Sequence, residues 1–156
     1  MKSVLMRENR LVIALIICGV FLRLLFLGKN DLWYDEAFTL LIVKKDLFFA
    51  SPEFWNLPLF YIFIKFWVSL FGSSEFALRF LPALFSSAFL PVLYLVAKKI
   101  FSSKTALIAL ALQVFSPFHL WYAQEACHYS LPLLIGLSSV YFLYAGLKEN
   151  NVINFV

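Results

Sequence analysis

The chain has 156 residues and a formal charge of +4, with 63% hydrophobic and only 14% charged residues. Soluble domains are roughly 45–50% apolar and about 25% charged, and a small soluble domain leaves too much surface exposed to hide so many apolar side chains. Lys and Arg form short clusters rather than a continuous basic face. The composition therefore excludes a soluble domain, a disordered chain and a nucleic-acid partner, and it predicts a polytopic transmembrane protein built from helices in the lipid bilayer.

The first apolar run covers residues 11–28 and follows a basic start. Eighteen residues are enough for a transmembrane helix, which needs about 17–25. Because no small-residue cleavage site follows, the run predicts a first membrane span rather than a signal peptide, with the N-terminus in the cytoplasm. Arg23 interrupts the run, where a cation costs roughly 2.5–3.5 kcal/mol at a helix centre. It either extends toward the membrane surface or binds a lipid-linked phosphate.

Residues 29–56 are the longest polar stretch and predict a loop outside the membrane. Within it, residues 31–43 predict a short helix that lies at the membrane interface, with Asp31 as its N-cap. Asp35 and Glu36 fall in the first turns, where the helix dipole favours acids. Adjacent carboxylates on a helix point in different directions, so one of them can face a substrate while the other holds a metal or a helix end.

Residues 80–97, 105–123 and 131–147 are further predicted spans, and a polar segment at 124–130 joins the last two. If the basic loop 98–104 is cytoplasmic, both polar segments lie outside the membrane. Residues 58–71, which contain Lys65, are then re-entrant or interfacial rather than a crossing. The alternative is that 58–71 does cross and that the basic loop lies outside. The first reading is favoured, because it brings the two acidic segments to one face.

Three further side chains are candidates for chemistry. Glu125 and His128 share a face if their turn is helical, and a mixed acid and imidazole set suits Mg²⁺ or Mn²⁺. Lys65, like Arg23, is a cation in an apolar run that either extends to the interface or binds a phosphate. For each of these residues, and for Asp35 with Glu36, a purely structural role at a helix end or on a solvated surface remains open.

Four segments, taken in chain order, form a recognisable pattern: residues 31–38 (Asp-Leu-Trp-Tyr-Asp-Glu-Ala-Phe), 56–61 (Asn-Leu-Pro-Leu-Phe-Tyr), 74–80 (Ser-Glu-Phe-Ala-Leu-Arg-Phe) and 116–126 (Ser-Pro-Phe-His-Leu-Trp-Tyr-Ala-Gln-Glu-Ala). This pattern resembles the N-terminal part of the GT-C fold glycosyltransferases that use polyprenyl-phosphate sugars. The closest group is the dolichyl-phosphate-mannose protein mannosyltransferase family with its bacterial relatives. The resemblance covers about residues 11–147, and no single motif in it is diagnostic.

The resemblance implies a membrane enzyme that transfers a sugar from a polyprenyl-phosphate donor to a protein, lipid or glycan acceptor on the extracytoplasmic side, with inversion. It implies that Asp35 is the catalytic carboxylate, that Glu36 is its catalytic partner, and that Glu125 belongs to the same site as a substrate-binding residue. Arg79 would be a structural or phosphate-side residue. No cofactor is certain, and a divalent cation (Mg²⁺ or Mn²⁺) stays an open alternative.

The chain departs from the family pattern at three positions. Asn56 replaces a His, Leu57 replaces a Pro, and Cys127 replaces an Arg. Family members run to several hundred residues, so residues 1–156 are expected to be the N-terminal part of one transmembrane transferase domain. The alternatives are a truncated or degenerate membrane protein without catalytic activity, or a partner subunit. A transporter is a more distant alternative. The sequence does not name the sugar or the acceptor.

Overall fold

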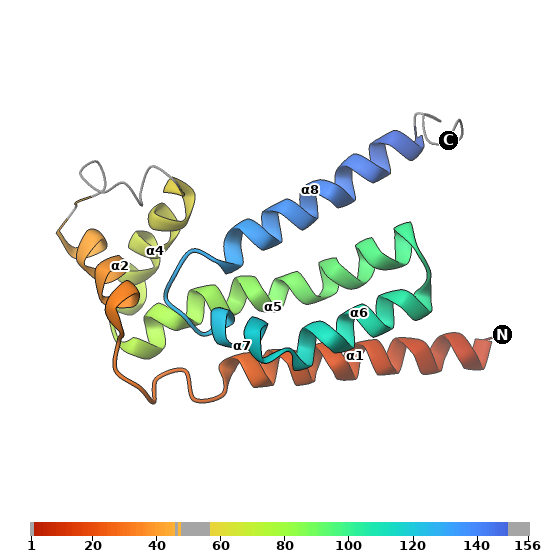
Figure 1. The fold of residues 1–156 in the computed structure, drawn as a ribbon, viewed down its shortest axis with the longest axis horizontal. Helices are drawn as coiled ribbons and strands as arrows, with labels where there is room; N and C mark the ends of the chain where they lie inside the picture. Colours follow the sequence, from red (N-terminus) through yellow and green to blue (C-terminus); the bar gives the residue numbers. More distant parts are fainter. Residues whose placement is uncertain (1, 46, 48–56, 150–156) are drawn as a thin grey trace.

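The computed structural model describes residues 2–45, 47 and 57–149 of the chain. All elements in this part are helices: α1 (Lys2–Leu24), α2 (Tyr34–Lys44), α4 (Pro58–Phe71), α5 (Glu75–Ile100), α6 (Ser103–Phe115), α7 (Pro117–Ala123) and α8 (Ser130–Glu149). Helices α1, α5, α6 and α8 run along the length of the molecule in alternating directions (Figure 1). The prediction of an all-α fold is confirmed.

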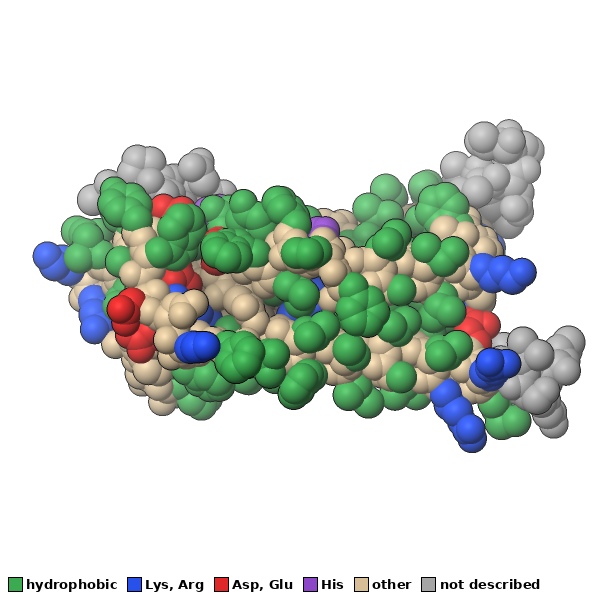
Figure 2. Space-filling model, turned by 60° about the horizontal axis from the view of Figure 1, so that its bottom comes forward, with side chains coloured by type: hydrophobic (Ala, Val, Ile, Leu, Met, Phe, Trp, Pro, Cys, Tyr) green, Lys and Arg blue, Asp and Glu red, His purple; other side chains and the backbone are tan. Residues whose placement is uncertain are grey.

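Two of the described helices are long and apolar enough to cross a membrane, namely Glu75–Ile100 and Ser130–Lys148. The pair α6 and α7 would make a third crossing if this bent pair is one span. Figure 2 shows hydrophobic side chains along the length of the visible face, while Lys and Arg side chains gather toward its two ends. This distribution is typical of a membrane-embedded bundle, and the chain is an all-α membrane protein.

Helix α1 has different bounds from the predicted span at 11–28. It begins at Lys2 and ends at Leu24, because Phe26 adopts a left-handed φ of 62° that a helix cannot continue through. The part of α1 inside the predicted run is therefore shorter than the 18 residues expected. That residues 11–28 cross the membrane stays a prediction.

The predicted span at 105–123 is broken in the structure. Helices α6 and α7 meet at an angle of 62° on either side of Ser116. Pro117 lacks an N–H and forces the residue before it out of the helical region, so Ser116 is extended, with φ −69° and ψ 117°. The Ser116 hydroxyl then accepts a hydrogen bond from the His119 N–H and caps α7. That residues 105–123 cross the membrane, as one bent span, stays a prediction.

Helix α5 lies at the centre of the bundle and contacts α1, α4, α6, α7 and α8. One apolar core joins α1, α5 and α6 and contains Val12, Leu90, Tyr94, Ala97, Ala106, Leu110 and Val114. A Cβ on Gly19 would lie 2.6 Å from Leu90 Cδ1 and 3.0 Å from Val114 Cγ2. Gly19 therefore permits the close contact among these three helices.

Helices α2 and α4 lie at one end of the bundle, where the segment 116–129 also turns back (Figure 1). A second core joins them to α5 and α8, formed by Ile42, Val43, Phe60, Tyr61, Ile64, Leu78, Leu81, Ala126 and Leu131. With 14 residues at about 1.5 Å each, α4 is roughly 21 Å long, against a hydrocarbon core about 30 Å thick. Whether α4 is re-entrant or crosses the membrane stays open.

Candidate active site

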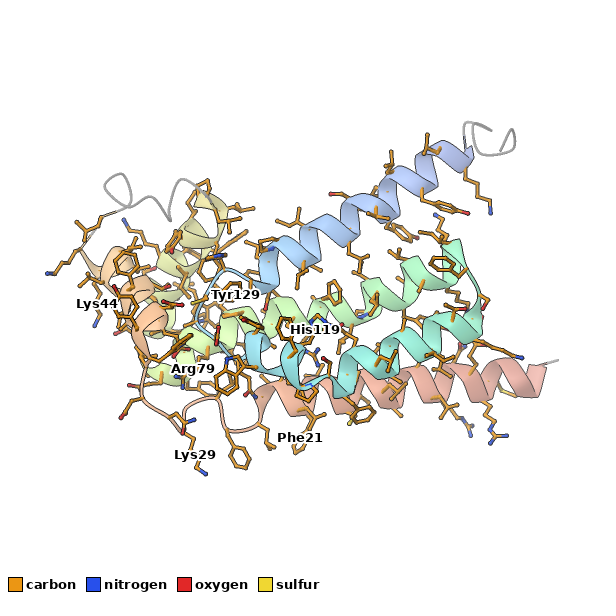
Figure 3. The ribbon with its side chains drawn as sticks, in the orientation of Figure 1. Phe21, Lys29, Lys44, Arg79, His119 and Tyr129 are labelled. Atoms are coloured by element: carbon orange, nitrogen blue, oxygen red, sulfur yellow. The ribbon has the colours of Figure 1, made fainter. Side chains whose placement is uncertain are left out.

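A buried ion pair connects the start of α2 to the start of α5. Arg79 Nε and Nη2 donate to the two oxygens of Glu36 at 2.7 and 2.6 Å, which is the bidentate geometry of a strong Arg–carboxylate pair. Glu36 is 1% exposed, and Arg79 is also buried. Figure 3 shows Arg79 at the end of the bundle near α2. The pair therefore joins the polar loop at 25–33 and α2 to the helical bundle.

Arg79 has an acceptor for each of its five N–H groups. Besides the two bonds to Glu36, Nη1 donates to the carbonyls of Leu27 at 2.9 Å and Asn30 at 2.7 Å, and Nη2 donates to that of Asp31 at 3.0 Å. A guanidinium has five donors, so none remains for a ligand. Of the two predicted roles for Arg79, this geometry favours the structural one over contact with a phosphate.

The predicted N-cap of α2 was wrong. Trp33, not Asp31, precedes the first helical residue, and the Trp33 N–H donates to Glu36 Oε2 at 3.3 Å. The physical reason is that Arg79 holds the carbonyls at residues 27–31 in the loop, so the helix begins later. Glu36 therefore serves both as the third residue of α2 and as the partner of Arg79.

The segment 124–126 is hydrogen-bonded both to the end of α1 and to Glu36. The Gln124 side-chain amide donates to the carbonyls of Leu22, Arg23 and Leu25 at 2.9–3.2 Å, where α1 ends. Two residues later, the Ala126 N–H donates to Glu36 Oε1 at 2.9 Å. As predicted from the membrane topology, the structure brings the two acidic segments to the same end of the bundle.

Asp35 and Glu36 face different cavities, as the helical geometry predicted for neighbouring acids. Asp35 is half-buried and lines a cavity of 210 Å³ together with Tyr34, Phe38, Thr39, Tyr61, Cys127, His128 and Tyr129. We call it the Asp35 cavity. Glu36 lines a cavity of 180 Å³ together with Phe26, Leu27, Asn30, Asp31, Trp33, Arg79, Trp121, Gln124 and Glu125. We call it the Glu125 cavity.

In the Asp35 cavity, carboxylate, imidazole, hydroxyl and phenol groups converge on a space the size of a small polar ligand. Burial lowers the pKa of His128, so the neutral imidazole is favoured there. Burial raises the pKa of the neighbouring Cys127 thiol to about 12, which makes it an unreactive neutral group. Tyr129, labelled in Figure 3, also lines this cavity, from the turn that precedes α8. Asp35 is the carboxylate side chain of this lining.

Glu125 and His128 were expected to share a face only if their turn were helical, and this condition is not met. Residues 124–129 form bends and turns rather than a helix, and the Cys127 N–H donates to the Glu125 carbonyl at 2.7 Å in a tight turn. Glu125 therefore lines the Glu125 cavity and His128 lines the Asp35 cavity. The bond from Ala126 to Glu36 holds the segment in this shape.

Glu125 is 5% exposed, and only one of its oxygens has a partner in the part of the chain that the structure describes. Its Oε1 accepts a hydrogen bond from the Trp121 indole N–H, whereas Oε2 is buried without a partner. Burial, followed by the nearby Glu36 and Asp35 charges, raises the pKa of Glu125. Trp121 is therefore the hydrogen-bond partner of Glu125 in the candidate site.

The two cations predicted inside apolar runs lie away from both cavity linings. Arg23 is 0% exposed and is held by neutral oxygens: Nε donates to Ser86 Oγ at 2.8 Å and Nη1 donates to the Gly19 carbonyl at 3.0 Å. Lys65 is exposed on α4. That either of them binds a phosphate stays a prediction. The Asn56 position lies outside the described residues.

No group of three or more His, Cys, Asp or Glu side chains comes close enough to hold a metal ion within the described residues. The two candidate acids Asp35 and Glu125 line separate cavities, and both oxygens of Glu36 are engaged. The described side chains therefore do not fit a divalent-cation site, and no chemical step is assigned to one.

Sequence reasoning missed several cavity residues, among them Thr39, Tyr61 and Tyr129. Thr39 lies four residues after Asp35, a spacing that puts the two on one helix face. The sequence therefore contained the information needed to predict Thr39 beside Asp35. The Thr39 hydroxyl donates to the Asp35 carbonyl at 3.0 Å. Tyr61 comes from α4 and Tyr129 from the turn before α8, and only the tertiary fold brings them there.

A sequence model of one family, described as dolichyl-phosphate-mannose-protein mannosyltransferase, matches residues 51–156. This match covers α4, α5, α6, α7 and α8, including Arg79 and the segment 124–126. None of the curated proteins and none of the solved structures matches the chain.

Proposed function

The chain belongs to the dolichyl-phosphate-mannose-protein mannosyltransferase family, and we propose that Asp35 is the general base of its sugar transfer. The family makes the chain a membrane glycosyltransferase of the GT-C type. The proposal adds a polyprenyl-phosphate sugar as the donor and a protein, lipid or glycan group as the acceptor. The single observation that supports it is that Asp35 lines a cavity. The neighbouring Glu36 is buried and is held by hydrogen bonds from Arg79.

The proposed reaction is a single displacement at the anomeric carbon. Asp35 accepts the proton of an acceptor hydroxyl or amine, the acceptor atom bonds to the anomeric carbon, and the bond from that carbon to the phosphate oxygen breaks. The lipid phosphate leaves with its electron pair, and the configuration inverts. General-base catalysis of this kind contributes typically about 10²–10⁴-fold to a rate. His128 lines the same cavity and is placed to hydrogen-bond a substrate hydroxyl.

Glu36 is proposed as a positioning residue, which revises the catalytic role expected for it. Both of its oxygens are engaged by Arg79, Trp33 and Ala126, so neither is available to a substrate. Its bonds hold the first turn of α2, and this turn carries Asp35.

The proposed orientation puts both cavities on the extracytoplasmic side. The opposite end of the bundle carries the start of α1, the connection from α5 to α6 and the end of α8 (Figure 1). The basic residues in or beside these segments are Arg7, Arg10, Lys98, Lys99, Lys104 and Lys148, against Lys29, Lys44 and Lys45 at the candidate-site end. Cytoplasmic ends of membrane proteins are rich in Lys and Arg, which supports a cytoplasmic N-terminus.

The test compares Asp35→Asn with the unchanged protein in membranes supplied with polyprenyl-phosphate sugars. We expect transfer to fall by about 10²–10⁴-fold while membrane insertion is unchanged. Glu8→Gln is the matched control, because Glu8 is an acid at the opposite end that pairs with Lys98 at 3.2 Å. Full transfer by Asp35→Asn would refute the role of Asp35. If the unchanged protein neither transfers sugar nor binds the donor, the non-catalytic alternative replaces the proposal.

A further inference from the structure

The Glu125 cavity is separate from the proposed reaction centre. Among the described residues, its lining shares no member with that of the Asp35 cavity. On the side of the Glu125 cavity, Glu36 accepts hydrogen bonds from Arg79, which lines the same cavity, and from the Ala126 N–H. A ligand in the Glu125 cavity would therefore not meet an acceptor bound at Asp35, and the proposed transfer leaves this cavity without a role.

One residue that lines this cavity, Glu125, carries a buried acceptor without a donor among the described residues. Glu125 Oε2 is buried and has no hydrogen-bond partner in the described part of the chain. A buried carboxylate oxygen without a partner is strongly unfavourable, since it has lost its water and gained nothing in return. The raised pKa of Glu125, caused first by burial, agrees with a charge that lacks compensation. The site is therefore short of a hydrogen-bond donor and of positive charge.

The buried donors that line this cavity are already engaged. Arg79 uses all five of its N–H groups. The Trp121 indole donates to Glu125 Oε1, and the Gln124 amide donates to carbonyls at the end of α1. A fitting ligand group must therefore bring donors and needs few acceptors. A primary ammonium has three donors and no acceptor, whereas a sugar hydroxyl both donates and accepts.

Aromatic side chains at the cavity suit the same charge. Phe26, Trp33 and Trp121 line it and are each about half exposed or more, and cations bind the faces of such rings. The chain itself provides an example, since the Lys29 ammonium lies 5.2 Å from the centre of the Phe26 ring.

We propose that the Glu125 cavity binds a primary ammonium group, with Glu125 Oε2 accepting its hydrogen bond and the indole rings contacting its carbon chain. At the polar end of a membrane bundle, such a group comes from an ethanolamine phospholipid headgroup or from an amino sugar. The two sources share the ammonium chemistry. The site is independent of the proposed sugar transfer at Asp35.

The experiment uses the complete chain in lipid nanodiscs and follows the NMR shift of the Trp121 indole N–H, which donates to Glu125. The probe is ethanolamine, and ethylene glycol is its uncharged counterpart of the same size. We expect ethanolamine to bind at least tenfold more tightly than ethylene glycol, since hydrogen bonds to charged groups are about twice as strong as neutral ones. Choline, which has no N–H, should bind more weakly than ethanolamine.

Two variants separate this site from the reaction centre. Glu125→Gln should weaken ethanolamine binding at least tenfold, and Asp35→Asn should leave it within twofold of the unchanged protein. Equal binding of ethanolamine and ethylene glycol would overturn the proposal, as would an undiminished affinity in Glu125→Gln. If Glu125→Gln does not fold, the two-ligand comparison in the unchanged protein still decides.

Two further arms identify the source of the ammonium. If the headgroup is the ligand, nanodiscs of ethanolamine phospholipid compete with soluble ethanolamine, and discs of choline phospholipid do not. If an amino sugar is the ligand, D-glucosamine binds more tightly than ethanolamine in both kinds of disc. Loss of transfer in Asp35→Asn with ethanolamine binding intact separates the two proposals, because Asp35 tests the sugar transfer and Glu125 tests the ammonium site.

Discussion

Replacing Glu36 by Gln should destabilise the fold more than any other single-atom exchange at this end of the bundle. Glu36 accepts four hydrogen bonds, two from Arg79 and one each from Trp33 and Ala126. Glutamine puts an NH₂ group where one oxygen stood, so two of these donors would face another donor. The positive charge of Arg79 would then be buried without its counter-ion.

The expected loss is about 3–5 kcal/mol. Hydrogen bonds to charged groups contribute roughly 1.5–3 kcal/mol each, and Glu36→Gln removes two of them. Breaking a buried ion pair from one side typically destabilises by about the same 3–5 kcal/mol. Reversible denaturation in mixed micelles measures the free energy of unfolding. Glu8→Gln, at a part-buried pair with Lys98 near the opposite end, is the matched control and should cost less than Glu36→Gln, because this pair lies nearer the surface.

Glu36→Gln should also change the solvent accessibility of a nearby cysteine, which gives a second, local measurement. Cys127 is buried beside Ala126, whose N–H donates to Glu36, and this burial raises its thiol pKa to about 12. Loosening this link should expose Cys127 and speed its reaction with maleimide, measured in a Cys18→Ser background. An unchanged unfolding free energy together with an unchanged labelling rate would refute the reasoning that Glu36 organises this end of the molecule.

Two other predictions follow from the packing and the charges. Gly19→Ala should destabilise the fold by about 1–3 kcal/mol, because its Cβ would lie 2.6 Å from Leu90 Cδ1; Gly136→Ala, where nothing lies within 4 Å, is the control, and an equal effect of both would contradict the packing argument. Burial raises the pKa of Glu125, so the folded state binds its proton more tightly and stability falls as pH rises above about 4.5. Denaturation at several pH values should show this fall in the unchanged protein and a smaller one in Glu125→Gln; parallel curves would contradict it.

Most of the helices could be predicted from the sequence, because apolar runs bounded by turn residues are local signals. The run at 58–71 matches α4, and the turn that follows contains Gly72 with φ 80°. The break between α6 and α7 was also local, since Pro117 is visible in the sequence. It was overlooked because the apolar character continues across it.

The separation of Asp35 from Glu36 was likewise predictable, since it depends only on helical periodicity. The partner of Glu36 was not predictable, because Arg79 lies 43 residues further along the chain and no local pattern joins them. The same holds for Gln124, whose amide reaches carbonyls about 100 residues earlier. Such contacts depend on how the helices pack, which the sequence of one chain does not reveal by periodicity.

The ion pair between Glu36 and Arg79 also has a consequence for biogenesis. The ribosome synthesises Glu36 before Arg79, which lies 43 residues later in the chain. The Ala126 amide follows 90 residues after Glu36. Until α5 has been synthesised and inserted, Glu36 is expected to stay in water, because moving an unpaired carboxylate into the bilayer core is costly. The ion pair that holds the first polar loop therefore forms only after α5 has brought Arg79 next to Glu36. The candidate site is assembled late during membrane insertion.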